Sequence, residues 1–203
     1  MRSCPGAMML SNSHVRARTA RRWAMLGALA LAACGRGPDI GTPSPKLADA
    51  DYLRALRMMV PVAGTNPERL QNTFAGRRGD NGEREHLAID ILAPKGTPVV
   101  AAVDGEILRV TSNALGGKTI YATDRARRFV YYYAHLDRYA GRAKVGAQVK
   151  QGMVIGYVGT TGNSPKNVPH LHFQVMRMVA GRQWWEGPPV NPYGLFARAG
   201  TPH

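Results

Sequence analysis

The sequence predicts a mainly β domain that follows an export segment and one short helix. The chain has 203 residues, 44% of them hydrophobic, so it is long and apolar enough to bury one core of ordinary size. From about residue 85 onward, short runs rich in Val, Ile and Tyr alternate with turns that contain Gly, which is typical of antiparallel β structure. We therefore predict one domain at residues 62–196 and a tail at residues 197–203.

Residues 1–33 have the layout of an export signal. They contain five Arg and no acidic residue, and they end in an apolar run of 11 residues. A membrane-spanning helix needs about 18–20 apolar residues, so this run is too short to span a bilayer as a mature helix. The run stops at Leu31-Ala32-Ala33-Cys34, which resembles the lipobox of bacterial lipoproteins, where the cysteine carries the lipid. The alternative is a plain signal peptide followed by an unrelated cysteine.

Charge and cysteine content limit the classes of function. The net charge is +14, and it falls to +9 once the five Arg of the export segment are removed. A basic exported protein suits an anionic surface such as a cell wall. Nucleic-acid binding would depend on charge alone, because the chain has no basic stretch interleaved with aromatic residues, so we expect no nucleic-acid partner. The two cysteines, Cys4 and Cys34, are too few for a disulfide framework or a cysteine-rich zinc finger.

Two connecting segments precede the β domain. Residues 34–46 are rich in Gly and Pro and are predicted to be a flexible tether. Residues 47–61 are predicted to form a short packing helix, because Leu53, Leu56 and Val60 recur at helical spacing and a proline ends the segment.

The predicted strands are separated by turns with recognisable chemistry. Ala93-Pro94-Lys95-Gly96 stops the first strong strand, and the dipeptide that begins at Asp104 is typical of a hairpin turn. The strands that we expect lie at residues 89–92, 97–103, 106–110, 118–123, 129–134, 153–158 and 170–178. Many short strands of this kind indicate a mainly β domain.

Four histidines and one aspartate are candidates for a metal site. His86, His135, His170 and His172 each lie at or near the end of a predicted strand. Because side chains alternate across a strand, His86 and Asp90 are expected to share one face. The same alternation predicts that His170 and His172 lie together. A lone histidine in a core is more often structural than a ligand, but four histidines with an acid at this spacing favour a site.

Imidazole nitrogen and carboxylate oxygen form a ligand set that suits zinc. Three protein ligands plus a water are typical of a catalytic zinc, whereas a structural zinc more often has four protein ligands, usually with cysteine. The predicted β domain contains no cysteine. The pattern therefore favours a single catalytic Zn²⁺, which would lower the pKa of its water to about 7.

A series of motifs extends from the first of these histidines to the last. It consists of His86-x-x-x-Asp90, Ala93-Pro94-x-Gly96-Thr97-Pro98-Val99, Asp104-Gly105, Tyr133-Ala134-His135-Leu136, Val149-x-x-Gly152-x-x-Ile155-Gly156-x-x-Gly159-x-Thr161-Gly162 and His170-Leu171-His172-Phe173. This series resembles the lysostaphin/LytM-type zinc metalloendopeptidases, which cut the peptides of peptidoglycan. The match covers about residues 75–178. One departure is Ala88, where the family usually has Gly, and a methyl group there is expected to alter the groove slightly without loss of metal.

The resemblance implies a fold and a site. The fold would be an antiparallel β-sheet groove of the duplicated hybrid motif type, with zinc held by His86, Asp90 and His172. His135 and His170 would be the catalytic pair beside the metal-bound water. All five polar residues are intact, which favours an active endopeptidase over the alternative, a non-catalytic wall-binding module or an activator of another wall hydrolase.

The resemblance and the export signal together imply where the protein acts. Lipidation of Cys34 would anchor a monomeric protein in a membrane of the cell envelope, facing the periplasm, and the outer membrane is the expected location. The substrate would be a peptidoglycan peptide. In that setting a bond between D-Ala and meso-diaminopimelate is the expected target.

Two aromatic positions have two interpretations each. Tyr133 lies two residues before His135, so it is expected either to donate a hydrogen bond to an oxyanion or to pack in the core. Trp184 and Trp185 would either stack on a sugar or anchor a surface loop.

Overall fold

The structure covers the predicted β domain and the helix before it. The computed structural model describes residues 48–79 and 81–197. The predicted export segment at residues 1–33, the lipidation residue Cys34, the tether and all of the tail after residue 197 lie outside the described residues. Within the described part of the chain, no helix is long and apolar enough to cross a bilayer.

One short α-helix precedes the sheet. Helix α1 spans Asp49–Ala55, with two acidic residues in its first turn and a basic residue in its last, which complements the helix dipole. Leu53 is fully buried in the core. The helix is shorter than the segment predicted at residues 47–61, because Arg57 has a positive φ of 47° and the chain then runs extended. Val60 is buried as expected, but it reaches the core from this extended segment.

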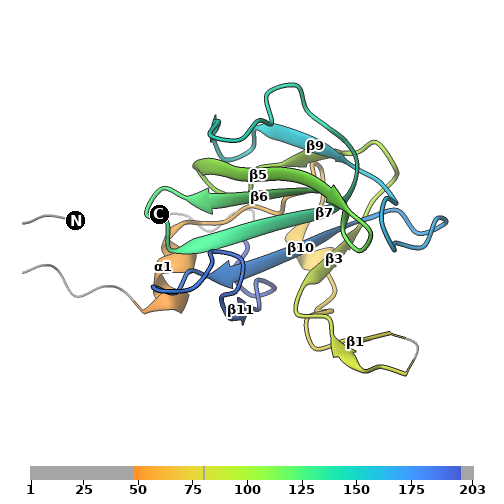
Figure 1. Cartoon of the computed structure of the whole chain (residues 1–203), viewed down its shortest axis with the longest axis horizontal. Coiled ribbons are helices and arrows are strands. Elements are labelled where there is room, and N and C mark those ends of the chain that lie inside the picture. Colours follow the sequence, from red (N-terminus) through yellow and green to blue (C-terminus); the bar gives the residue numbers. More distant parts are fainter. Residues whose placement is uncertain (1–47, 80, 198–203) are drawn as a thin grey trace, which may run out of the picture. The chain divides into compact units, whose positions relative to one another are not determined.

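The rest of the domain is built from antiparallel strands, and the mainly β fold class is confirmed. The elements are η1 (Pro67–Arg69, a single 3-10 turn), β1 (Arg77–Arg78), β2 (Arg84–Glu85), β3 (Ile89–Leu92), β4 (Pro98–Val100), β5 (Gly105–Asn113), β6 (Gly117–Asp124), β7 (Phe129–Tyr139), β8 (Gln148–Val149), β9 (Val154–Val158), β10 (His170–Arg177) and β11 (Pro189–Val190). Figure 1 shows β5, β6, β7 and β10 side by side in the main sheet.

The main sheet has nine strands, and its topology brings distant segments together. The central path runs β11-β10-β7-β6-β5-β8, while β9 joins β7 to β4. Strand β10 pairs with β7 along one side and with β3 and β11 along the other. Strands β1 and β2 form a separate hairpin (Figure 1). As a result, β3, β10 and β7 lie next to one another although they are far apart in sequence.

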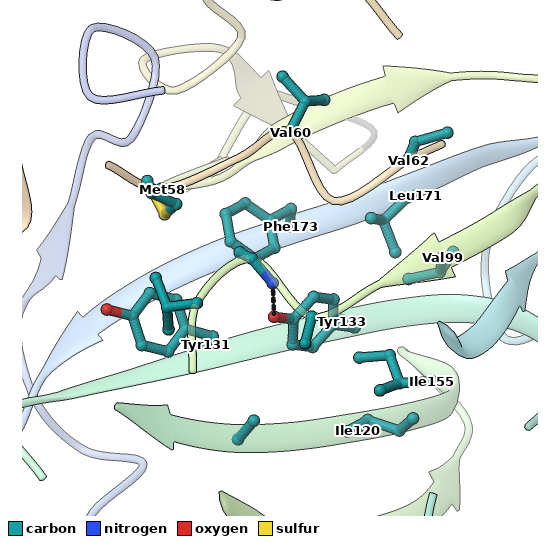
Figure 2. Close-up of a cluster of buried hydrophobic side chains, with 14 of the residues drawn as sticks. Met58, Val60, Val62, Val99, Ile120, Tyr131, Tyr133, Ile155, Leu171 and Phe173 are labelled. Carbon is teal, nitrogen blue, oxygen red and sulfur yellow. Dashed lines mark hydrogen bonds between the residues drawn. The ribbon is translucent and has the colours of Figure 1, made fainter. Parts of the chain in front are cut away.

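Large side chains of β7 and β10 fill the core on one face of the sheet (Figure 2). Tyr133 and Phe173 are at most 1% exposed, and their ring centroids lie 5.2 Å apart. The Tyr133 hydroxyl accepts a hydrogen bond from the Ala102 N–H at 3.0 Å, so its buried oxygen has a partner. Burial of one such side chain contributes roughly 1.5–3 kcal/mol. This packing fixes the register of β7 against β10 and thereby positions the side chains on their opposite face.

Candidate metal centre

The five predicted polar residues lie together on the face of the sheet opposite the core. Antiparallel pairing of β3 with β10 sets His172 opposite Asp90 and His170 opposite Leu92. Pairing of β10 with β7 sets His172 opposite Ala134, one residue before His135. Strand register therefore gathers residues that are more than 80 positions apart in the chain.

Three potential ligand atoms converge closely. His86 Nε2 lies 2.9 Å from Asp90 Oδ1 and 3.0 Å from His172 Nδ1. His172 Nδ1 lies 3.2 Å from the same carboxylate oxygen. All three ligand atoms lie within 4.8 Å of one another. Two imidazole nitrogens and one carboxylate oxygen are a donor set that zinc accepts, so the residues present fit the predicted metal.

A hydrogen bond to the backbone orients the His86 ring. Its Nδ1–H donates to the Thr73 carbonyl at 2.9 Å, which leaves the lone pair of Nε2 directed at the other two ligand atoms. The Thr73 hydroxyl accepts from the Asp90 N–H at 2.9 Å and donates to the Ala88 carbonyl at 3.2 Å. Thr73 thus holds both His86 and the start of β3 in place.

The route by which His86 reaches Asp90 differs from the prediction. Simple alternation along one strand is wrong here, because β3 begins only at Ile89 and Leu87 has a positive φ of 55°. The His86 N–H donates to the carbonyl of Gly76 at 2.7 Å, so the residue is held by the preceding loop. The two side chains still meet, but a left-handed residue turns the chain between them.

His135 also departs from strand alternation. It has a positive φ of 61°, and the registers of β7 with β6 and with β9 both shift in this part of the strand. The irregularity turns its imidazole toward the groove, whereas Tyr133, two residues earlier, points into the core. The core interpretation of Tyr133 is therefore confirmed, and its role as a donor to the oxyanion is wrong. Tyr132 lines the groove instead.

The two remaining histidines share a common arrangement. His135 Nδ1–H donates to the Thr161 carbonyl at 2.9 Å, and His170 Nδ1–H donates to the Val168 carbonyl at 2.8 Å. Each ring therefore keeps the lone pair of Nε2 free. The ring centroids lie 5.0 Å apart, and His170 Nε2 is 3.8 Å from Asp90 Oδ1. The pair thus flanks the three convergent ligand atoms.

Burial and hydrogen bonds set the charges in the site. Burial alone would raise the pKa of Asp90, but the close contacts of its carboxylate with the His172 and His86 imidazoles outweigh burial and hold that pKa well below its usual value. Burial also lowers the pKa of His172. Burial is the main cause that lowers the pKa of His135 to about 4, so this imidazole is neutral at pH 7. The site therefore combines an ionised Asp90 carboxylate with a neutral His135 imidazole.

Sequence reasoning missed one charged neighbour. Arg78 Nη2 lies 2.7 Å from Asp90 Oδ2, the carboxylate oxygen that does not face the histidines. The guanidinium therefore holds the carboxylate so that Oδ1 remains directed at His86 and His172. Nothing in the sequence separates Arg78 from its neighbour Arg77, since only the β1–β2 hairpin geometry turns one of them toward the site.

A groove of about 680 Å³ lies over the five residues. Its walls include the β1–β2 hairpin, the β5–β6 turn and the loop that precedes β10. Leu92, Leu115 and Val168 line it and are each at least 40% exposed, so the groove offers apolar contacts to a ligand. Trp184 lies outside its lining and packs edge-on against Tyr121 with ring centroids 5.1 Å apart, which favours the loop-anchor interpretation.

Comparisons with known proteins agree with this geometry. The sequence profile of Peptidase family M23 matches residues 84–192, more than half of the chain. An L-Ala–D-Glu endopeptidase of Bacillus subtilis is 34% identical over 119 residues, which cover 56% of this chain and 36% of that protein. The peptidoglycan DD-endopeptidase ShyC of Vibrio cholerae is 36% identical over 93 residues, which cover 46% of this chain and 20% of that protein.

The fold comparison gives the same result. The solved structure of the antimicrobial peptidase lysostaphin from Staphylococcus simulans matches with a TM-score of 0.51 and 28% identity, over 72% of this chain and 57% of that chain. The predicted resemblance to lysostaphin is confirmed. This chain spans only between 20% and 36% of the length of the two curated relatives above.

Proposed function

Since the chain belongs to peptidase family M23, we propose that it is a zinc-dependent endopeptidase that hydrolyses peptide bonds of peptidoglycan in the cell envelope. The observation that supports this most strongly is the convergence of His86, Asp90 and His172, whose ligand atoms lie within 4.8 Å of one another. An open groove over these atoms gives a peptide access to them. A closed structural site would leave no such access.

The three convergent residues would hold one zinc ion, and His135 and His170 would act on the substrate. Bound zinc supplies a Lewis acid that acidifies water and polarises a carbonyl group. The free Nε2 of neutral His135 can accept a proton from an attacking water, and that of His170 faces the same space. Once protonated, either imidazole can donate to the carbonyl oxygen or to the departing amine. We assign the two as a pair, because each ring donates its Nδ1–H to a backbone carbonyl and keeps its Nε2 free.

The groove itself supports a peptide substrate. Its exposed apolar residues Leu92, Leu115 and Val168 can contact alkyl side chains. Arg84 places a guanidinium on one wall, beside Glu85 and the ion-paired Arg78, and this group can bind a carboxylate. Stem peptides of peptidoglycan combine both features, since they carry alanine methyl groups and carboxylates. The bond between D-Ala and meso-diaminopimelate is the target that we propose.

The membrane location is a separate part of the proposal. Export through residues 1–33 and lipidation of Cys34 would hold a monomeric domain near the wall, at the outer membrane. The mass of the N-terminal peptide from membrane-extracted protein tests this, and an unmodified Cys34 would contradict it.

Digestion of purified sacculi tests the enzymatic proposal. The zinc-loaded protein is expected to release new muropeptides, a chelator to stop the release, and added zinc to restore it. Identical muropeptide profiles in all three conditions would overturn the proposal. Mass analysis of the released fragments identifies the bond that is cut.

A further inference from the structure

One edge of β3 has no partner strand among the described residues, since β3 pairs with β10 on one side only. The Ala93 N–H donates to the carbonyl of Pro169 at 3.4 Å, toward the β10 side. The Asp90 N–H instead donates to the Thr73 hydroxyl at 2.9 Å, on the opposite side. Because backbone groups alternate along a strand, the Leu92 N–H also points away from β10. This edge therefore offers a backbone donor to another extended chain.

A second groove of about 660 Å³ runs along the free edge, between β3 and the segment around η1. Its lining includes Thr65, Asn66, Arg69, Leu70, Asp90 and Leu92, and we name it the edge groove. Asp90 and Leu92 also line the groove over the histidines. A peptide bound at the metal site can therefore continue past Leu92 into the edge groove.

The edge groove carries one cation that the rest of the structure does not use. Its charged lining residues are Arg69 and Asp90. The Asp90 carboxylate is already bonded to Arg78 and to the histidines. Arg69 is exposed, and it makes no ion pair with any residue that the structure describes. A guanidinium binds carboxylates well, so the groove is suited to an acidic ligand.

We infer that the edge groove binds one arm of an acidic stem peptide, which adds to β3 as an extra strand and directs a carboxylate to Arg69. Strand addition is a general mode of peptide recognition, in which the backbone gives affinity and side-chain contacts give specificity. The inference rests on the proposed function and sharpens it, because it favours carboxylate-bearing stem peptides over neutral bridges. Continuity with the metal site argues for the substrate as the occupant.

The charge contribution is tested with two cross-linked stem peptides, one with free carboxylates and one with the same carboxylates amidated. Arg69→Gln is expected to raise KM for the acidic peptide about three- to fivefold, with kcat and the amidated peptide unaffected. Arg77→Gln is the matched control, since this exposed arginine lines neither groove, and it is expected to change nothing. Equal KM values for Arg69→Gln and wild type on the acidic peptide would overturn the inference.

The strand-addition contribution is tested at Leu92. Leu92→Pro removes the outward N–H without touching the hydrogen bonds to β10, and Leu92→Ala keeps that N–H. Proline is expected to raise KM at least about threefold above alanine, because one backbone hydrogen bond is lost. Should Leu92→Pro fail to fold, a peptide with N-methylated backbone amides replaces it, and unchanged binding of that peptide would contradict strand addition.

Binding and turnover are separated by using the zinc-loaded His135→Ala protein. Calorimetry on this variant measures peptide affinity without cleavage. Tighter binding of the acidic peptide than of the amidated one supports the edge groove even if wild-type protein cleaves neither, in which case only the proposed function fails. If both peptides are cleaved and bind with equal affinity, the inference about the edge groove is wrong and the proposed enzymatic function stands. A dimer in solution that Leu92→Pro dissociates would assign the edge to a second copy of the chain and contradict the inference.

Discussion

The site residues fall into two groups that reach the groove by different means. Asp90, His170 and His172 lie on regular strands, where antiparallel register sets His172 opposite Asp90 and strand alternation places His170 on the same face as His172. His86 and His135 depend on irregular backbone, because Leu87 and His135 itself have positive φ values of 55° and 61°. Regular strands thus fix the positions of three site residues, while two residues in the left-handed backbone conformation bring the other two histidines to them. Such conformations cost roughly 1–3 kcal/mol each for non-glycine residues and tend to occur at functional sites.

Loss of a strand-borne ligand should have the largest effect. His172→Ala is expected to lose bound zinc and to lower the rate of sacculus digestion by at least about 10³-fold, since metal and turnover disappear together. Metal analysis of the purified variant, alongside its digestion rate, checks this. A variant that retains one zinc per chain would show that His172 is not a ligand.

Loss of the histidine on the bulged strand should separate metal from turnover. His135→Ala is expected to keep one zinc per chain and to lose about 10²- to 10³-fold in kcat, which is the usual contribution of a general acid or base. Zinc content and kcat are measured on the same preparation. Full activity, or loss of the metal, would mean that the assignment of His135 to the catalytic pair is wrong.

Removal of the Arg78–Asp90 ion pair tests whether Asp90, although it lies on a regular strand, also needs Arg78 to orient its carboxylate. Arg78→Gln is expected to weaken zinc binding about 10- to 100-fold, because outer partners of a ligand orient it. Competition with a chelating dye measures the affinity. Arg77→Gln serves as the control on the same short strand, and an equal loss in both variants would indicate a general charge effect.

The smallest effects are expected from substitutions that compare the left-handed position Leu87 with the regular strand β3. Leu87→Val is expected to lower the free energy of unfolding by about 2 kcal/mol and to weaken zinc binding, because a β-branched residue resists positive φ. Ile91→Val, a buried change on regular β3, is expected to cost about 1 kcal/mol and to leave zinc affinity unchanged. Denaturant unfolding and zinc titration of both variants check the contrast, which equal zinc affinities would contradict.

Much of the fold and of the site could be predicted. The errors in backbone course share one cause, which is a positive φ at Arg57, Leu87 or His135. Residue type and turn chemistry were sufficient for seven of the eleven described strands, but not for the two-residue strands β1, β2, β8 and β11. They also indicated the five polar residues, because imidazoles beside a carboxylate point to metal chemistry. Alternation failed at Leu87 and around His135, since neither residue type signals a positive φ. Both interpretations of Tyr133 fit the sequence, and only the contact of its hydroxyl with the Ala102 N–H separates them. Helical periodicity also predicted too long a helix, because Val60 fits the apolar pattern of a helix although it reaches the core from an extended segment.

Contacts between elements that lie apart in the chain could not be predicted from the sequence. The contact between Arg78 and Asp90 depends on how the β1–β2 hairpin folds over the site. The edge groove depends on β3 having a partner on one side only, which a strand pattern does not reveal. Both features arise from how elements pack and not from the residues of any one element.

A zinc-edge anomalous diffraction map of the zinc-loaded protein tests the assignment of the metal site most directly. We predict one peak per chain in contact with His86 Nε2, Asp90 Oδ1 and His172 Nδ1, with His135 and His170 beside it and not bonded to it. A peak held by a different set of residues, or none at all in protein that digests sacculi, would contradict the assignment.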